Sequence, residues 1–112
     1  MEEGCIFCKI VGGDIPAERV LENDDFIVIR DANPKVDGHS LVISKKHYDT
    51  FFDMPKELYS GMLETAKEFV EKLGVDNFNL VVNNGKFAGQ LVSHVHLHIL
   101  PRSEGDGFSL NA

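Results

Sequence analysis

The chain has 112 residues, 43% of them hydrophobic and eight of them phenylalanine, which suffices for one domain with its own core. Its net charge of −7 and lack of a basic cluster argue against binding to nucleic acid or an anionic membrane. Apolar runs fall far short of the roughly 20 residues of a membrane-spanning helix. The acidic start lacks the features of a secretory signal, so we expect a cytoplasmic protein with reduced cysteines.

An N-terminal arm, residues 1–12, precedes three predicted strands. The strands are runs of β-branched and aromatic residues separated by turn-forming Asn, Asp, Gly and Pro. We expect them at 19–21, 26–29 and 39–43, paired as an antiparallel meander. A short helix is expected next, at 48–52.

A long amphipathic helix is predicted over residues 53–73, because apolar side chains recur there at steps of three and four. Two strands follow at 78–82 and 92–100, and residues 103–112 form a loosely held tail. This order predicts a single α+β domain, with a five-stranded antiparallel sheet, one long helix and one short helix.

The run His-Val-His-Leu-His at residues 94–98 carries the most chemical information. Because side chains alternate along a strand, we expect the three histidines on one face and the intervening apolar residues in the core. From the residues alone, three interpretations remain open: a metal site, solvated surface residues, or a site that binds phosphate.

This run resembles the signature of the histidine triad (HIT) superfamily of nucleotide hydrolases and transferases, which residues 94–100 match at every position. The resemblance extends to the Hint-like branch, which includes protein kinase C inhibitor proteins. It implies that residues 1–112 form a single HIT domain. It also implies a homodimer, in which the long helix and the strand 78–82 pair across a two-fold axis. The further segments that carry the resemblance are 5–10, 13–17, 38–47 and 88–93.

By resemblance, the middle histidine, His96, is the nucleophile. Neutral imidazole can form a covalent phosphoramidate, and one displacement then becomes two easier ones. The implied reaction is attack on the α-phosphorus of a purine nucleoside phosphate derivative, such as a phosphoramidate or a dinucleoside polyphosphate, followed by hydrolysis. In this scheme His98 hydrogen-bonds the phosphate, the carbonyl of His94 accepts from His96 Nδ1, and His39 lies beside His98.

The resemblance also implies a pocket for a purine nucleotide such as AMP, in which Asp31 binds the ribose hydroxyls. Taken alone, the apolar side chains of this pocket are equally typical of a core, and the loop before the triad is typical of a turn. At Leu91 many Hint-like enzymes have a serine that passes a proton to the leaving group, so Leu91 favours substrates with good leaving groups. The implied base-binding residues are Ile6, Phe7, Ile10, Ile15 and Ile29, and the implied phosphate-binding residues are Asn83, Gly89, Gln90, Leu91 and Val92.

Cys5 and Cys8 have the spacing of a metal-ligand pair, which also occurs in redox proteins and by chance. Zinc-bearing members of the superfamily combine such a pair with two histidines, which correspond here to His47 and His94. The resemblance thus implies a structural Cys₂His₂ zinc site and no organic cofactor. Two other functions remain open: a noncatalytic purine-nucleotide-binding adaptor with a structural zinc, and a zinc or redox protein centred on the cysteines.

Overall fold

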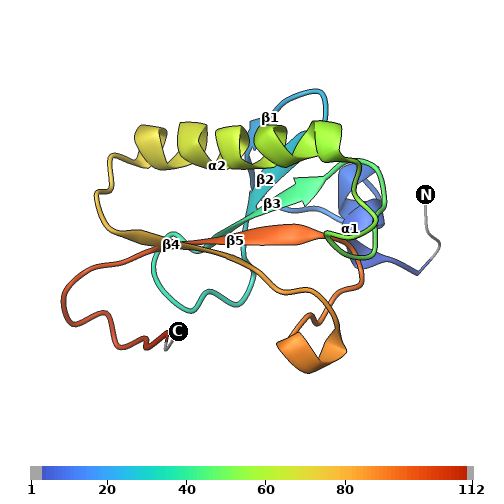
Figure 1. Ribbon diagram of the computed structural model, residues 1–112. Coiled ribbons are helices and arrows are strands. Elements are labelled where there is room, and N and C mark those ends of the chain that lie inside the picture. Colours follow the sequence, from blue (N-terminus) through green and yellow to red (C-terminus); the bar gives the residue numbers. More distant parts are fainter. Residues whose placement is uncertain (1–3, 111–112) are drawn as a thin grey trace.

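A computed structural model describes residues 4–110 and contains one five-stranded antiparallel sheet with a helix on each face (Figure 1). The strands lie in the order β1-β2-β3-β5-β4, so β5 lies between β3 and β4. This confirms the predicted α+β class and antiparallel sheet. Within the described residues, no helix has the length and apolarity to cross a bilayer. The elements are α1 (Ile6–Val11), β1 (Arg19–Glu22), β2 (Phe26–Arg30), β3 (Ser40–Ser44), α2 (Tyr59–Leu73), β4 (Phe78–Val82) and β5 (His96–Pro101), with 3-10 turns at Lys56–Leu58 and Lys86–Ala88.

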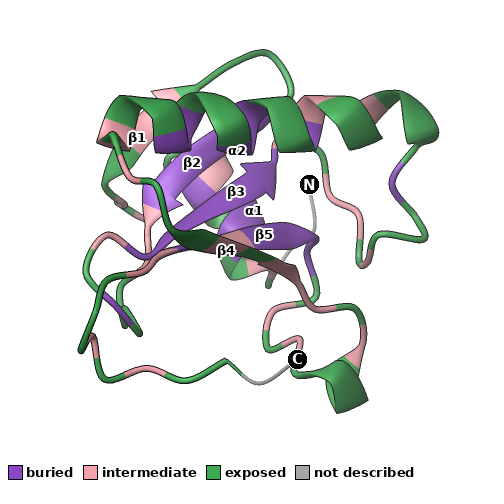
Figure 2. Cartoon of the chain, turned by 60° about the vertical axis from the view of Figure 1, so that its left-hand side comes forward, coloured by how far each residue is buried: buried purple, intermediate pink, exposed green. Residues whose placement is uncertain are grey.

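Both faces of the central strands are covered, so β2 and β3 are buried along nearly their whole length (Figure 2). Strands covered on both faces need continuous apolar runs, and both segments have them. On one face, α2 packs against the strands through Met62, Ala66, Phe69 and Val70. On the other, α1 packs through Phe7 and Ile10 onto Ile27, Ile29, Leu41 and Ile43.

The prediction of a helix at residues 48–52 is wrong, and α2 begins at Tyr59, later than the predicted residue 53. Residues 50–53 form a turn, closed by a hydrogen bond from Asp53 N to the Thr50 carbonyl and by bonds from Thr50 N and Oγ1 to the Asp53 carboxylate. Pro55 is extended, and a 3-10 turn then leads into α2. Gly74 ends α2 in the left-handed region, at φ +70°, as its position after the periodic segment suggested.

The short helix lies instead in the N-terminal arm, as α1. The Cys5 sulfur accepts a hydrogen bond from Cys8 N and so caps its first turn. At its end, the Arg19 guanidinium donates to the carbonyls of Ile10 and Val11. Helix α1 is therefore fixed on the sheet, with Phe7 and Ile10 buried beneath it.

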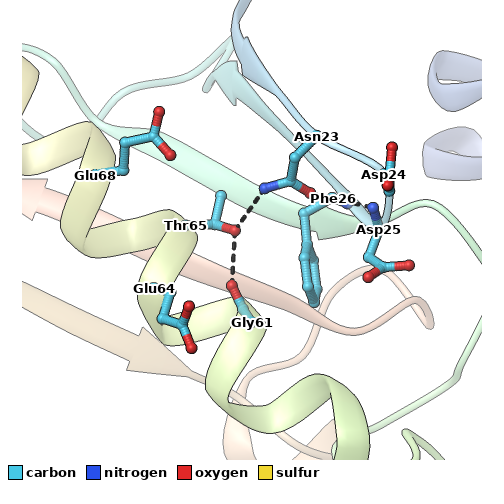
Figure 3. A pocket seen from close by; sticks show the side chains of 8 residues that line it. All are labelled: Asn23, Asp24, Asp25, Phe26, Gly61, Glu64, Thr65 and Glu68. Carbon is cyan, nitrogen blue, oxygen red and sulfur yellow. Dashed lines mark hydrogen bonds between the residues drawn. The ribbon is translucent and has the colours of Figure 1, made fainter.

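The turn between β1 and β2 is attached to α2 through Asn23 (Figure 3). The Asn23 side-chain oxygen accepts from the backbone amides of Asp25 and Phe26, and its amide nitrogen donates to Thr65 Oγ1 at 2.9 Å. Thr65 in turn donates to the Gly61 carbonyl of α2. These bonds fix the start of β2, the strand that leads to Asp31.

The C-terminal segment is held more firmly than predicted. The Arg102 guanidinium bonds both carboxylate oxygens of Asp106, the Asn79 side chain and the Phe108 carbonyl. Strand β4 pairs with β5 on one side only, so it forms an edge of the sheet, and its Phe78 and Leu80 are partly exposed. Pairing of this edge with a second copy of the chain stays a prediction.

The fold predicts a large loss of stability for Ile99→Ala. Ile99 is fully buried beneath α2, between Ser40 of β3 and Leu80 of β4. We expect the free energy of unfolding, measured by urea denaturation, to fall by about 2–5 kcal/mol. Glu64→Ala, on the exposed side of α2, is the control and should change it by less than about 0.5 kcal/mol. Equal losses in both variants would contradict the packing described above.

Candidate functional site

The chain bends before it enters β5, so the strand predicted from residue 92 begins only at His96. His94 N bonds the Val92 carbonyl at 2.8 Å, and Val95 N bonds the Tyr48 carbonyl at 2.7 Å. His94 thus precedes the strand, yet it keeps to the α1 side, because the Phe7 ring meets the rings of both His94 and His96. The apolar partners Val95, Leu97 and Ile99 lie in the core beneath α2, as predicted.

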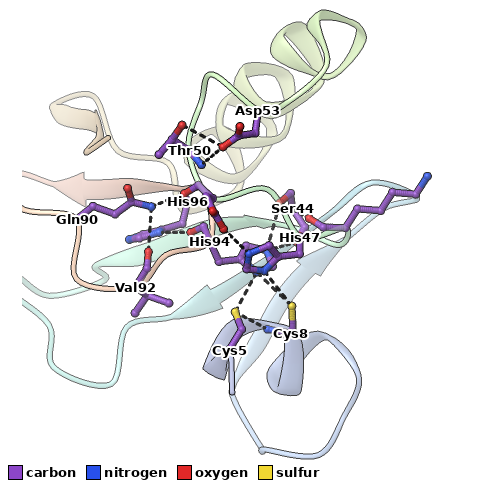
Figure 4. Close-up of polar contacts among 12 residues, drawn as sticks. Cys5, Cys8, Ser44, His47, Thr50, Asp53, Gln90, Val92, His94 and His96 are labelled. Atoms are coloured by element: carbon purple, nitrogen blue, oxygen red, sulfur yellow. Dashed lines mark hydrogen bonds and ion pairs between the residues drawn. The ribbon is translucent and has the colours of Figure 1, made fainter. Parts of the chain in front are cut away.

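Two sulfurs and two imidazoles meet between α1 and the end of β3 (Figure 4). Cys5 Sγ lies 3.3 Å from His94 Nδ1, and Cys8 Sγ lies 3.3 Å from His47 Nδ1. The four ligand atoms all lie within 4.8 Å of one another. The structure therefore brings together the four residues that the resemblance implied as metal ligands.

The Nε2 atom of each of these histidines, which faces away from the sulfurs, already makes a hydrogen bond. His94 Nε2 donates to the Ser44 carbonyl at 2.7 Å, and His47 Nε2 donates to the Asp49 carboxylate at 2.7 Å. Both rings must therefore turn a lone pair on Nδ1 toward the sulfurs. Burial lowers the pKa of His94, which favours the neutral form that binds metals. Two thiolates and two oriented neutral imidazoles suit a tetrahedral zinc ion. Sequence analysis missed Asp49, whose only signal is its position two residues after His47.

His96 is buried and has a defined orientation. Its Nδ1 donates to the His94 carbonyl at 2.7 Å, the hydrogen bond that the resemblance implied. Nε2 therefore carries the lone pair. Burial lowers the pKa of His96, so the ring is neutral at neutral pH. The arrangement can present an unprotonated nitrogen to an electrophile.

The proton on His98 is placed by a chain of hydrogen bonds that starts at the backbone. Lys35 N donates to His39 Nδ1 at 3.1 Å, so the His39 proton must sit on Nε2. His39 Nε2 then donates to His98 Nδ1 at 2.9 Å, and the proton of His98 is left on Nε2. Desolvation, aided by His96 and His39, lowers the pKa of His98 to about 4. His98 is thus a neutral hydrogen-bond donor.

Asp31, His39 and His98 form a second group with metal-ligand atoms close together. Asp31 Oδ2 lies 3.4 Å from His39 Nε2. A metal on His39 Nε2 would require a proton on Nδ1, where the Lys35 amide already points its own hydrogen. The group is therefore better suited to hydrogen bonding than to metal binding.

An apolar cavity of about 370 Å³ opens between α1 and β2. Its lining includes Asp31 and all five residues implied for the base. It also includes Pro16, Ala17 and Leu41, which sequence analysis missed. Leu41 could have been found, since it alternates with His39 along the strand predicted there. The residues from the predicted set are Ile6, Phe7, Ile10, Ile15 and Ile29.

The residues implied for phosphate binding differ in what their side chains contact. Asn83 and Gly89 are neighbours, because a Cβ on Gly89 would lie 4.0 Å from Asn83 Nδ2. The Gln90 side chain bonds three backbone groups of the protein itself. The Leu91 side chain is 94% exposed and donates no proton. Any contact from Leu91 or Val92 to a phosphate would have to come from their backbone amides.

Known proteins are similar to this chain in sequence and in fold. An uncharacterised HIT-like protein of Methanocaldococcus jannaschii is 50% identical over 106 residues, which cover 92% of this chain and 82% of that protein. An adenosine 5'-monophosphoramidase of Schizosaccharomyces pombe is 40% identical over 98 residues, covering 88% and 74%. The crystal structure of a zinc-bound histidine triad family protein from Mycobacterium smegmatis superimposes with a TM-score of 0.87 at 40% identity, covering 95% and 80%.

The family match is also direct. Residues 12–105 match the HIT domain, which is most of the chain. The strand order, the histidine run and the solved relatives all agree with that match. The chain therefore belongs to the HIT domain family.

Proposed function

We propose that this protein is a nucleotide hydrolase or transferase that acts at the α-phosphate of purine nucleoside phosphate derivatives, AMP–X. The observation that carries the proposal is the buried His96, whose Nε2 lone pair is fixed by the bond from Nδ1 to the His94 carbonyl. The activity of the Schizosaccharomyces relative, an adenosine 5'-monophosphoramidase, supports this class of substrate.

In the proposed reaction, His96 Nε2 attacks the α-phosphorus and forms a P–N bond. The bond from phosphorus to X breaks, and X leaves with the electron pair and takes up a proton. Water then attacks phosphorus and loses a proton, which balances the proton taken up by X. The P–N bond breaks with its electron pair returning to Nε2, and AMP and neutral His96 are released. The neutral Nε2–H of His98 donates to the phosphate throughout, because positioning and charge stabilisation are the main needs of phosphoryl transfer.

The other parts of the site bind and orient the nucleotide. The apolar cavity encloses the base, and Asp31 at its rim binds the ribose hydroxyls. Such a cavity holds any flat apolar face, and purines gain most because their stacking area is larger. Leu91 cannot supply a proton to X, so anhydrides and other good leaving groups should react faster than unactivated amines.

We further propose that Cys5, Cys8, His47 and His94 hold a structural zinc ion. The donor set and the oriented Nδ1 atoms fit zinc, and the Mycobacterium smegmatis neighbour is zinc-bound. When bound, the ion would supply a rigid crosslink between the N-terminal arm and the segment that leads into β5. It would thereby hold Ile6 and Phe7 at the base pocket.

His96→Asn tests the proposed nucleophile. Turnover of AMP–X should fall more than about a thousandfold, since the covalent step is lost, while AMP affinity should change only a few-fold. Ser93→Ala, an exposed position just before the histidine run, should leave turnover unchanged. Intact-protein mass spectrometry after a rapid quench should detect a nucleotidyl adduct on the wild type and not on His96→Asn.

Unchanged turnover in His96→Asn would refute the assignment of the nucleophile. Absence of both adduct and product in the wild type, with AMP still bound, would instead indicate a nucleotide-binding adaptor.

Cys5→Ser tests the zinc proposal. The bound zinc, measured by elemental mass spectrometry, and the melting temperature should both fall, because one of four ligands is lost. The rate of the chemical step in the remaining folded protein should change less than the zinc content does. Lys9→Ala, exposed on the same helix, should leave the zinc content unchanged. Wild type purified without chelators that contains no zinc yet has normal stability would contradict the proposal.

The lowered pKa of His98 predicts a loss of stability in acid. The unfolded chain takes up a proton near the ordinary histidine value of about 6.5, whereas folded His98 stays neutral down to about 4. Stability should therefore fall as the pH drops from about 6.5 towards 4. Urea denaturation at about pH 7 and about pH 5 should show a smaller loss for His98→Asn than for the wild type. Equal losses would contradict a neutral His98 in the fold.

A further inference from the structure

Gln90, the only glutamine of the chain, has a side chain fully engaged within the protein. Its Oε1 accepts from Gly85 N at 2.7 Å. Its Nε2 donates to the Asp49 carbonyl at 2.6 Å and to the Val92 carbonyl at 3.0 Å. Figure 4 shows the bond to Val92. A glutamine amide has two N–H donors, and both are used here. The side chain therefore has no donor left for a phosphate oxygen.

These bonds close the loop that precedes the triad. Gln90 N donates to the Gly85 carbonyl at 3.1 Å, while Gly85 N donates to the Gln90 side chain. The two residues are thus joined by a reciprocal pair of hydrogen bonds. Gly85 has φ +96° and ψ 155°, a conformation that other residues rarely adopt. Glycine adopts this conformation without strain but has many others open to it, and here the hydrogen bonds to Gln90 select this one.

The same side chain links the loop to the metal-ligand cluster. The Asp49 carbonyl accepts from Gln90, and the Asp49 carboxylate accepts from His47 Nε2. A second bond between the two segments runs from Phe51 N to Asn84 Oδ1 at 2.7 Å. Residues 83–92, the phosphate loop, are thus attached to the segment that carries His47.

We propose that Gln90 is a positioning residue, which holds the phosphate loop in its binding conformation before any nucleotide arrives and does not itself contact the phosphate. The backbone amides of Leu91 and Val92 follow directly on Gln90, so fixing its side chain also fixes their direction. A loop ordered in advance avoids an entropic cost on binding. This inference rests on the proposed function and assigns Gln90 a different role from the one implied by the resemblance.

Two substitutions separate positioning from direct contact. Gln90→Met keeps the size of the side chain and removes all its strong hydrogen bonds. Gln90→Glu removes the two N–H donors and adds a negative charge, so for this variant hydrogen exchange is the deciding measurement. Hydrogen exchange of the zinc-loaded, nucleotide-free proteins is measured, together with calorimetric affinities for AMP and adenosine. Phe87→Ala is the control, because this side chain in the same loop is fully exposed.

For both Gln90 variants we expect amides of the phosphate loop to exchange roughly tenfold faster or more, because these hydrogen bonds hold the loop closed. AMP affinity should fall by a similar factor, while adenosine, which lacks the phosphate, should bind as before. Phe87→Ala should match the wild type in all three measurements. Amides of α2 and β5 should stay protected in every variant.

In Gln90→Met, a loss of AMP affinity without faster exchange would overturn the proposal, since it would indicate that the side chain contacts the phosphate itself. Unchanged exchange and unchanged affinity would also overturn it. If Gln90→Met alone exposes α2 and β5, Gln90→Glu decides the outcome. Wild type that binds neither AMP nor adenosine would refute the proposed function, whereas the exchange comparison would still decide whether Gln90 orders the loop.

Discussion

His94 is the residue on which the rest of the site depends, because its side chain and its backbone carbonyl serve different purposes. Its imidazole turns Nδ1 to Cys5 and Cys8, and its backbone carbonyl accepts a hydrogen bond from His96 Nδ1. The Ser44 carbonyl fixes the ring by accepting from Nε2. One wholly buried residue therefore contacts both cysteines of the N-terminal arm and sets the orientation of His96.

The two apolar faces of the sheet divide the tasks of stability and binding. The face beneath α2 is a closed core that includes Val95, Leu97 and Ile99. The face beneath α1 is smaller and leaves a cavity between the arm and β2. Because histidines alternate with apolar residues, β5 contributes to both faces at once. Its interior place in the sheet, paired to β3 and β4, holds the site on a rigid strand.

Neutral imidazoles, oriented by backbone groups, characterise the chemistry of this protein. Burial lowers the pKa of His39, His94, His96 and His98. A neutral ring has one donor and one acceptor, so each backbone partner also decides what the opposite nitrogen can do. Lys35 N makes His98 a donor through His39, and the His94 carbonyl leaves His96 with a lone pair on its outer nitrogen.

The class of fold was predictable from the sequence because its signals are local, whereas the candidate site residues were proposed from the resemblance to a family. Each of these signals involves only a few neighbouring residues: the alternation from His94 to Ile99, the period of α2 and the spacing of the two cysteines. Tertiary structure decided the rest, since most of the missed features depend on contacts that the order of residues does not indicate. The carbonyl of Ile10, near the end of α1, accepts a hydrogen bond from Arg19. Strand β5 starts late because Val95 N donates to the Tyr48 carbonyl, and Thr50 N donates to the Asp53 carboxylate where a helix was expected. The Gln90 side chain reaches Asp49, 41 positions away, and no spacing in the sequence indicates that contact.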